Sequence, residues 1–144
     1  MKLKALVVDD SGIMRKMVMR GLRQSKLAEF DFVEAGDGAD ALAKFDPDET
    51  DMVFVDWNMP KMTGIEFVRE VRAKYQRHVP IVMITTESAV GKIEEAFEDA
   101  GVDAYITKPF TPDVLTKKLQ PLFSKLKAAP AKKSGGFFSK LLGG

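Results

Sequence analysis

The stretch LVVDD at residues 6–10 places an unbroken apolar run directly before two acidic residues. A second apolar run ends in the same way, as VFVD at residues 53–56, and a third strand-like stretch ends at Lys108-Pro109. Short continuous apolar runs are typical of strands that are buried on both faces, as they are in a parallel sheet. These runs therefore predict the sheet on which the rest of the fold is built.

Strand-like segments alternate with segments of helical period along the chain. Strands are expected at residues 3–9, 30–35, 52–56, 81–85 and 104–107. Five such β-α units predict an α/β fold, a doubly wound, five-stranded parallel sheet with helices on both faces and right-handed crossovers. The last helix is expected from about residue 111 to the region of Lys125, kinked or broken at Pro121 because proline lacks an amide donor.

Each expected helix carries an apolar stripe, which we expect to be buried against the sheet. The first helix, capped by Ser11, has the stripe Ile13, Met14, Met17, Val18 and Leu22. The third helix, from about Gly64, has Ile65, Val68 and Val71. The fourth has Ile93, Ala96, Phe97 and Ala100 on one face and Gly101 at its end.

Polar residues stand at the carboxyl ends of the expected strands, which is where doubly wound sheets bind their ligands. They are Asp9, Asp10, Asp56, Thr85 and Lys108. Gathered carboxylates concentrate negative charge, which is unfavourable unless a cation neutralises it or a pKa shifts. Because Mg²⁺ prefers oxygen ligands, often one or two carboxylates together with phosphate oxygens, the cluster indicates a metal-assisted phosphoryl site.

Each of these residues also has an ordinary structural interpretation. An aspartate after a strand is often a turn former or a helix cap, and most lysines are exposed. The combination favours the phosphoryl site, because a sheet that needs only caps gives no reason for a lysine before proline at the matching end of the fifth strand.

Composition limits the classes of function. A chain of 144 residues with 45% hydrophobic residues supports one domain and a tail. The formal net charge of +1 gives no global attraction to nucleic acid, and the absence of cysteine excludes disulfides and thiolate metal sites. The N-terminus MKLK runs into a short apolar stretch stopped by acids, unlike a signal peptide or a membrane span, so we expect a cytoplasmic protein.

At these motifs the sequence resembles the receiver domain of two-component response regulators, in particular the single-domain chemotaxis (CheY-like) type. The motifs are VVDDS at 7–11, DWNMP at 56–60 with Gly64 beyond, ITTE at 84–87 and YITKPF at 105–110. The resemblance covers roughly residues 2–126 and implies the flavodoxin-like strand order 2-1-3-4-5. It also implies a cis Lys108-Pro109 bond, although most X-Pro bonds in folded proteins are trans.

The resemblance and the chemistry together assign roles to the site residues. Asp56 is the expected phosphoacceptor, because a carboxylate attacking phosphorus gives a labile acyl phosphate. Asp9, Asp10 and Asp56, with the backbone carbonyl of Asn58, are the expected Mg²⁺ ligands. Lys108 is expected to contact a phosphoryl oxygen and Asp56, and Thr85 to offer its hydroxyl to the same group.

A switch is expected between Thr85 and Tyr105. If Thr85 moves toward the phosphoryl oxygens, Tyr105 can rotate from solvent into the vacated space and change the surface of the fourth helix, fifth strand and fifth helix. Without the resemblance Tyr105 reads as an ordinary strand aromatic. Asn58 and Glu87 match the residue types that tune hydrolysis in chemotaxis receivers, which implies a short-lived phosphoryl state.

The implied partners are a CheA-like sensor histidine kinase, a flagellar motor switch protein or other target, and a possible phosphatase, with the chain itself a monomer. The only histidine, His78, falls in a loop far from the strand carboxyl ends, so the phosphodonor histidine is expected on the kinase.

Residues 1–127 are expected to form the receiver domain and residues 128–144 a flexible tail with the short apolar tip FFSKLL. The tip suits docking on a partner groove, weak contact with a membrane surface or packing on the receiver, and it equally suits a disordered tail. If the tail begins a linker, the output is transcriptional or enzymatic.

Two other functions remain open. A phosphatase of the haloacid dehalogenase type requires a second acidic residue two positions after the nucleophile, and Asn58 occupies that position here. A degenerate scaffold would normally have lost Asp56, Lys108 or the acid pair.

Overall fold

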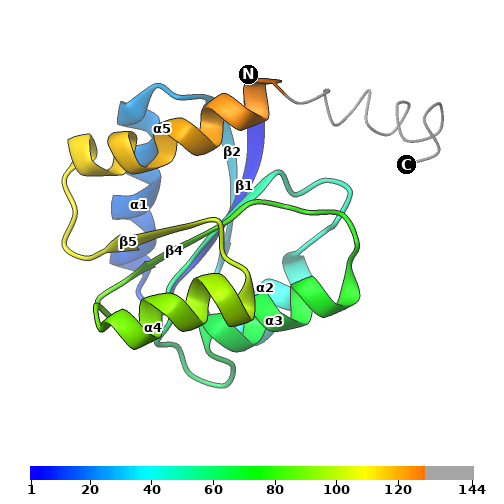
Figure 1. The fold of residues 1–144 in the computed structure, drawn as a ribbon. Coiled ribbons are helices and arrows are strands. Elements are labelled where there is room, and N and C mark those ends of the chain that lie inside the picture. Colours follow the sequence, from blue (N-terminus) through cyan, green and yellow to red (C-terminus); the bar gives the residue numbers. More distant parts are fainter. Residues whose placement is uncertain (129–144) are drawn as a thin grey trace.

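A parallel sheet forms the centre of the protein in a computed structural model, which describes residues 1–128 (Figure 1). Its strands are β1 (Lys2–Val8), β2 (Glu29–Ala35), β3 (Met52–Val55), β4 (Ile81–Thr85) and β5 (Ala104–Thr107). All neighbouring strands are parallel, and their order is β2-β1-β3-β4-β5. The predicted five-stranded, flavodoxin-like sheet is confirmed.

Helices cover both faces of this sheet. They are α1 (Gly12–Ser25), α2 (Gly38–Lys44), α3 (Gly64–Lys74), α4 (Val90–Glu94) and α5 (Pro112–Ala128). The α4 helix continues directly as a π-helical turn, η1 (Glu95–Ala100). As Figure 1 shows, α1 and α5 lie on one side of the sheet and α2, α3 and α4 on the other, which is the predicted doubly wound arrangement.

The core consists of two apolar layers, one on each face of the sheet. Phe67 and Val68 of α3 belong to one layer, and Leu22 of α1 with Leu115 of α5 to the other. Every residue of β3 and β4 is buried, which explains why their sequences are continuously apolar rather than alternating. Full burial of each large aliphatic side chain contributes roughly 1.5–3 kcal/mol, so these two strands anchor the fold.

Helix caps fix the short connections that leave the carboxyl ends of the strands. Ser11 accepts a hydrogen bond from the backbone N–H of Met14, which confirms the predicted cap of α1. Thr63 caps α3 and forms a reciprocal capping box with Glu66. Each cap satisfies an otherwise unpaired amide and so holds the start of its helix next to the end of the preceding strand.

Part of the predicted stripe of α1 is wrong. Ile13 and Met17 are 77% and 51% exposed. At helical spacing they share a face of α1 with Arg20 and Gln24, which are polar and exposed, so this face points to solvent. The residues of α1 that are buried are Val18, Met19, Gly21 and Leu22.

Phe97 is a second correction, because it is 42% exposed although Ala96 and Ala100 are buried as predicted. The prediction assumed the α-helical period, and the wider turn of η1 changes which residues share a face. Gly101 ends this helix with φ of 93°, in the left-handed conformation that glycine adopts at little cost.

The α5 helix runs through Pro121 without a break. Pro121 and Lys117, whose carbonyl loses its helical donor, are both exposed, so water can satisfy that carbonyl. Of the predicted tail at 128–144, residues 129–144 lie outside the described part of the chain, so the domain boundary at 127 stays a prediction. Within residues 1–128, no helix is both long and apolar enough to cross a membrane.

Candidate functional site

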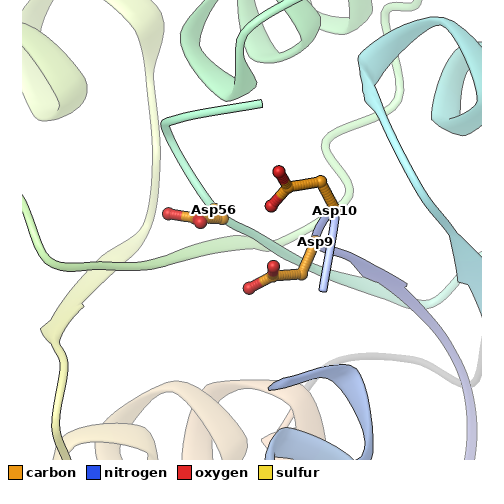
Figure 2. A group of neighbouring side chains, drawn as sticks. All are labelled: Asp9, Asp10 and Asp56. Atoms are coloured by element: carbon orange, nitrogen blue, oxygen red, sulfur yellow. The ribbon is translucent and has the colours of Figure 1, made fainter. Parts of the chain in front are cut away.

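Three carboxylates meet at the carboxyl ends of two adjacent strands. Asp9 and Asp10 follow β1, and Asp56 follows β3, whose backbone pairs with β1 through the bond from Asp56 N–H to the Val8 carbonyl at 3.0 Å. One oxygen from each carboxylate lies within 4.8 Å of the others. Asp9 and Asp56 are only 4% and 8% exposed, whereas Asp10 lies at the surface (Figure 2).

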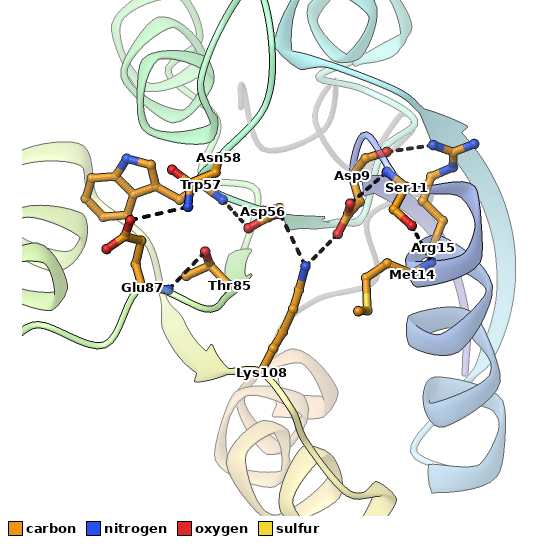
Figure 3. Close-up of polar contacts among 10 residues, drawn as sticks. All are labelled: Asp9, Ser11, Met14, Arg15, Asp56, Trp57, Asn58, Thr85, Glu87 and Lys108. Atoms are coloured by element: carbon orange, nitrogen blue, oxygen red, sulfur yellow. Dashed lines mark hydrogen bonds and ion pairs between the residues drawn. The ribbon is translucent and has the colours of Figure 1, made fainter.

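Lys108 reaches two of these carboxylates from the end of β5. Its Nζ lies 2.8 Å from Asp9 Oδ2 and 3.2 Å from Asp56 Oδ2, as Figure 3 shows. The lysine side chain is 8% exposed, so the pairing takes place largely out of water. The Lys108-Pro109 bond is cis, as the resemblance implied and as the general preference for trans did not.

Backbone amides hold the other oxygens of the two buried carboxylates. Ser11 N–H donates to Asp9 Oδ1 at 2.9 Å, and Trp57 N–H donates to Asp56 Oδ1 at 2.7 Å. Each buried carboxylate thus accepts one amide and one ammonium hydrogen bond, which offsets much of the cost of burying its charge. Both side chains are thereby held in defined positions.

Gly64 allows α3 to start directly against the end of β3. A Cβ added there would lie 1.9 Å from the backbone oxygen of Asp56, and the Gly64 N–H donates to the Trp57 carbonyl at 2.9 Å. Only a residue without Cβ fits this approach, so Gly64 contributes to where Asp56 sits.

Thr85 ends β4 and is fully buried, at 0% exposure. Its Oγ1 accepts a hydrogen bond from the Glu87 N–H at 3.4 Å, and no hydrogen bond joins it to Asp56 within residues 1–128. The Glu87 carboxylate in turn accepts one from Asn58 Nδ2 at 3.3 Å. The structure therefore brings Asn58, Thr85 and Glu87 to the rim of the carboxylate cluster as one connected group (Figure 3).

Tyr105 of β5 occupies the inward position. It is 7% exposed, its hydroxyl donates to the Glu87 carbonyl at 2.7 Å, and its ring lies 6.4 Å from that of Phe97. Burial raises the pKa of Tyr105 to about 12, with a further contribution from the negative charges of Glu87 and Asp56. The phenol is therefore neutral over the physiological range.

Two contacts at the site involve residues that the sequence did not single out. Arg15 of α1 donates from Nη1 to the Asp9 carbonyl at 2.6 Å and from Nε to Glu34 Oε1 at 2.9 Å. The Lys92 ammonium of α4 lies 4.8 Å from the centre of the Trp57 ring. In the sequence both basic residues look like ordinary solvated helix residues, because only the packing of α1 and α4 brings them to the strand ends.

The residues present fit a small divalent cation. Three carboxylates lie together, and the single ammonium group of Lys108 contacts two of them within the described chain, so negative charge is in excess when all three are ionised. Asp10 accepts no hydrogen bond from any residue in 1–128 and keeps its oxygens available. Hard oxygen donors with one exposed carboxylate suit Mg²⁺, which keeps several of its waters and needs an open side.

The sequence and the fold of the chain both match those of known proteins of one family. The sequence model of the family described as "Response regulator receiver domain" matches residues 5–120. The chain is 44% identical over 120 residues to chemotaxis protein CheY1 of Helicobacter pylori, covering 82% of this chain and 94% of that protein. It is 40% identical over 125 residues to chemotaxis protein CheY of Pseudomonas aeruginosa, covering 86% and 98%. The solved structure of Vibrio cholerae chemotaxis protein CheY4 superposes with a TM-score of 0.72 at 40% identity, covering 84% of this chain and 98% of that one.

Proposed function

The chain belongs to the response regulator receiver family as a CheY-like receiver domain, and we propose on that premise that it is a phosphorylation-switched signalling protein of the chemotaxis type. Asp56 accepts a phosphoryl group from a sensor histidine kinase. The observation that supports this most directly is the meeting of Asp9, Asp10, Asp56 and Lys108, which come from three separate strand ends.

The transfer forms one bond and breaks another. An Asp56 carboxylate oxygen attacks phosphorus, and the bond from phosphorus to the donor's imidazole nitrogen breaks, with its electron pair leaving on that nitrogen. Lys108, already paired with Asp56, is placed to contact an oxygen of the arriving phosphoryl group as a point charge. Thr85 offers its hydroxyl from β4, and exposed Thr86 leaves an opening for the donor.

Asp9, Asp10 and Asp56 are the residues we assign to hold Mg²⁺, with the Asn58 backbone carbonyl as a further proposed ligand. When bound, the ion neutralises charge on the transferring phosphoryl group. The amide that Ser11 donates and the ammonium of Lys108 fix Asp9, whereas Asp10 is free to complete the coordination.

Incubation with acetyl phosphate and Mg²⁺ tests this proposal against its alternatives. A hydroxylamine-labile adduct of one phosphoryl group on Asp56 supports the receiver function. Continuous release of phosphate without an accumulating adduct favours a phosphatase of the haloacid dehalogenase type, although Asn58 replaces the second acid that such an enzyme needs. No adduct and no release would leave a scaffold that binds without phosphorylation.

Removal of the metal should abolish the adduct. With excess EDTA, Lys108 is the one cation within residues 1–128 that pairs with the clustered carboxylates, and the incoming phosphoryl oxygens add further negative charge, so we expect the rate of adduct formation to fall at least about 100-fold. Readdition of Mg²⁺ should restore it, and Na⁺ at equal ionic strength is the control. A rate that is unchanged in EDTA would contradict the metal assignment.

We also propose that Thr85 and Tyr105 form the switch. Tyr105 bonds to the Glu87 carbonyl, and Glu87 bonds to Thr85 and Asn58 at the rim of the site, so a shift of Thr85 toward a phosphoryl group reaches the tyrosine through one residue. The surface that changes consists of α4, β5 and α5, and it is the proposed docking surface for the target.

Tyr105→Phe tests the hydrogen bond that holds this switch inward. Near neutral pH the variant should be less stable by about 1 kcal/mol, because the Glu87 carbonyl loses its donor. In the wild type the pKa is raised from 10.0 to about 12, so the unfolded chain loses the proton first and the free energy of unfolding falls above about pH 10. Urea unfolding across this range should show a smaller fall for Tyr105→Phe. An equal fall in the free energy of unfolding of both proteins would contradict the raised pKa of a buried Tyr105 phenol.

The proposed partners are those that the resemblance to chemotaxis receivers implies: a CheA-like kinase, a flagellar motor switch protein or other target, and a phosphatase. His78 lies before β4, at the amino end of the sheet, with Nε2 2.7 Å from Asp103 Oδ1, which favours a donor histidine on the kinase. A monomer in the cytoplasm is part of the proposal. The second candidate, a receiver joined to a transcriptional or enzymatic output domain, depends on residues 128–144, and the tail remains a proposal.

A further inference from the structure

Arg15 links three elements around the acidic pair. Its guanidinium, carried by α1, donates to the Asp9 carbonyl and to Glu34 of β2, at 2.6 Å and 2.9 Å. The arginine side chain is 21% exposed and that of Glu34 is 40% exposed, so the contact is partly shielded from water. Gly12 and Gly36 flank the guanidinium, since a Cβ added at either would lie within 4 Å of it.

The carbonyl that Arg15 contacts has no partner in the sheet. Asp9 N–H still donates to the Ala35 carbonyl at 3.1 Å, but β2 ends at Ala35 and the chain then turns at Gly36 into α2. No backbone N–H among residues 1–128 donates to the Asp9 carbonyl. Arg15 therefore supplies the donor that a longer β2 would have given, and it does so from a side chain (Figure 3).

This carbonyl belongs to the peptide group that joins Asp9 to Asp10. The group is planar, so its orientation sets ψ of Asp9 and φ of Asp10, and with them the direction of the Asp10 Cα–Cβ bond. Asp10 accepts no hydrogen bond in the described chain, so the backbone is what sets the direction from which its carboxylate approaches the cluster, through the Cα–Cβ bond. We propose that Arg15, anchored by Glu34, is a positioning residue that orients the Asp9–Asp10 peptide and so aims the Asp10 carboxylate at the metal site.

This inference rests on the proposed function and deepens it. Arg15 does not ligate Mg²⁺, yet the affinity of the site for the ion depends on it. The direction of the change in Mg²⁺ affinity when Arg15 is replaced separates a positioning role from a simple effect of its charge. A guanidinium near the site repels a cation, so loss of its charge alone would tighten Mg²⁺ binding. Loss of its positioning weakens binding instead. The guanidinium makes both contacts at once through its planar fork, which an ammonium group cannot reproduce.

The test measures Mg²⁺ affinity of the full chain from the fluorescence of Trp57, the single tryptophan, whose amide bonds to Asp56. Arg15→Lys keeps the positive charge and loses the simultaneous contact with the Asp9 carbonyl and Glu34. Arg15→Gln loses both the charge and that contact. Glu34→Gln keeps Arg15 but weakens the ion pair that anchors it. Arg20→Lys, an exposed position on the same helix, is the matched control. Circular dichroism verifies that each variant folds, and Glu34→Gln leaves the arginine in place should an Arg15 variant fail to fold.

We expect Arg15→Lys and Arg15→Gln each to weaken Mg²⁺ binding about 10-fold, which is the lower end of the loss seen when partners of metal ligands are removed. Glu34→Gln should weaken it less and Arg20→Lys not at all. At saturating Mg²⁺ the Arg15 variants should form the Asp56 adduct as fast as the wild type, which general damage to the fold would not permit. Unchanged affinity in Arg15→Lys, or tighter binding in Arg15→Gln, overturns the inference while the wild type still binds Mg²⁺. A wild type that binds no Mg²⁺ overturns the proposed function and the inference together.

Discussion

Asp56→Asn should abolish the phosphoryl adduct while leaving the protein folded. The amide keeps the size of the side chain and an oxygen that accepts the Trp57 N–H, but it is neutral and a poor nucleophile. Because removal of a nucleophile eliminates the reaction path itself, we expect adduct formation from acetyl phosphate to fall by at least about 10⁴-fold. Intact-protein mass spectrometry after brief exposure to acetyl phosphate and Mg²⁺ measures this directly.

Stability separates this loss from misfolding. Asp56 is one of three clustered carboxylates, of which Lys108 contacts two, so its neutralisation relieves repulsion in the metal-free protein. Without Mg²⁺ the free energy of unfolding should therefore be unchanged or higher by up to about 1 kcal/mol, and the midpoint of thermal unfolding should be unchanged or higher accordingly. Asp113→Asn, at an exposed position in the first turn of α5, is the matched control and should keep the adduct. An adduct that persists in Asp56→Asn and maps to Asp10 would refute the assignment.

The sequence could predict the sheet and the cluster because both depend on local patterns. Apolar runs such as those before Asp9 and Asp56 signal buried strands, and parallel pairing places their carboxyl ends at one edge. Once that edge is known, acids and a lysine that are far apart in sequence must meet there. The strand order itself came from the resemblance, because alternation of strands and helices does not specify it.

The remaining features depend on how helices pack, which periodicity does not report. Ile13 and Met17 are apolar and correctly spaced, yet α1 turns them toward solvent because Val18 and Leu22 face the sheet. Phe97 is exposed because the helix widens into η1. Arg15 becomes part of the site only because β2 ends before it reaches a residue whose N–H could satisfy the Asp9 carbonyl.

Gly64→Ala should cause the largest loss of stability of any substitution at the site. The added Cβ would lie 1.9 Å from the Asp56 carbonyl oxygen, 2.8 Å from the Asp56 carbonyl carbon and 3.2 Å from Trp57 Cα. These are backbone atoms, so no change of rotamer relieves the overlap, and the start of α3 must move away from the end of β3. We expect a loss of about 3 kcal/mol or more, measured by urea unfolding followed through Trp57 fluorescence.

Gly91→Ala is the matched control, because a Cβ added there meets no atom within 4 Å. Gly91 lies inside α4, where alanine is favoured over glycine by roughly 0.5–1 kcal/mol, so this variant should be unchanged or more stable. The two substitutions are chemically identical, and their difference isolates the approach of α3 to Asp56 from the general preference for alanine in helices. If α3 does retreat, it carries the Gly64–Trp57 hydrogen bond with it and displaces Asp56, so the folded fraction of Gly64→Ala should also bind Mg²⁺ more weakly. A Gly64→Ala protein within about 0.5 kcal/mol of the wild type would mean that the strand end can yield, and that Asp56 is not held by this contact.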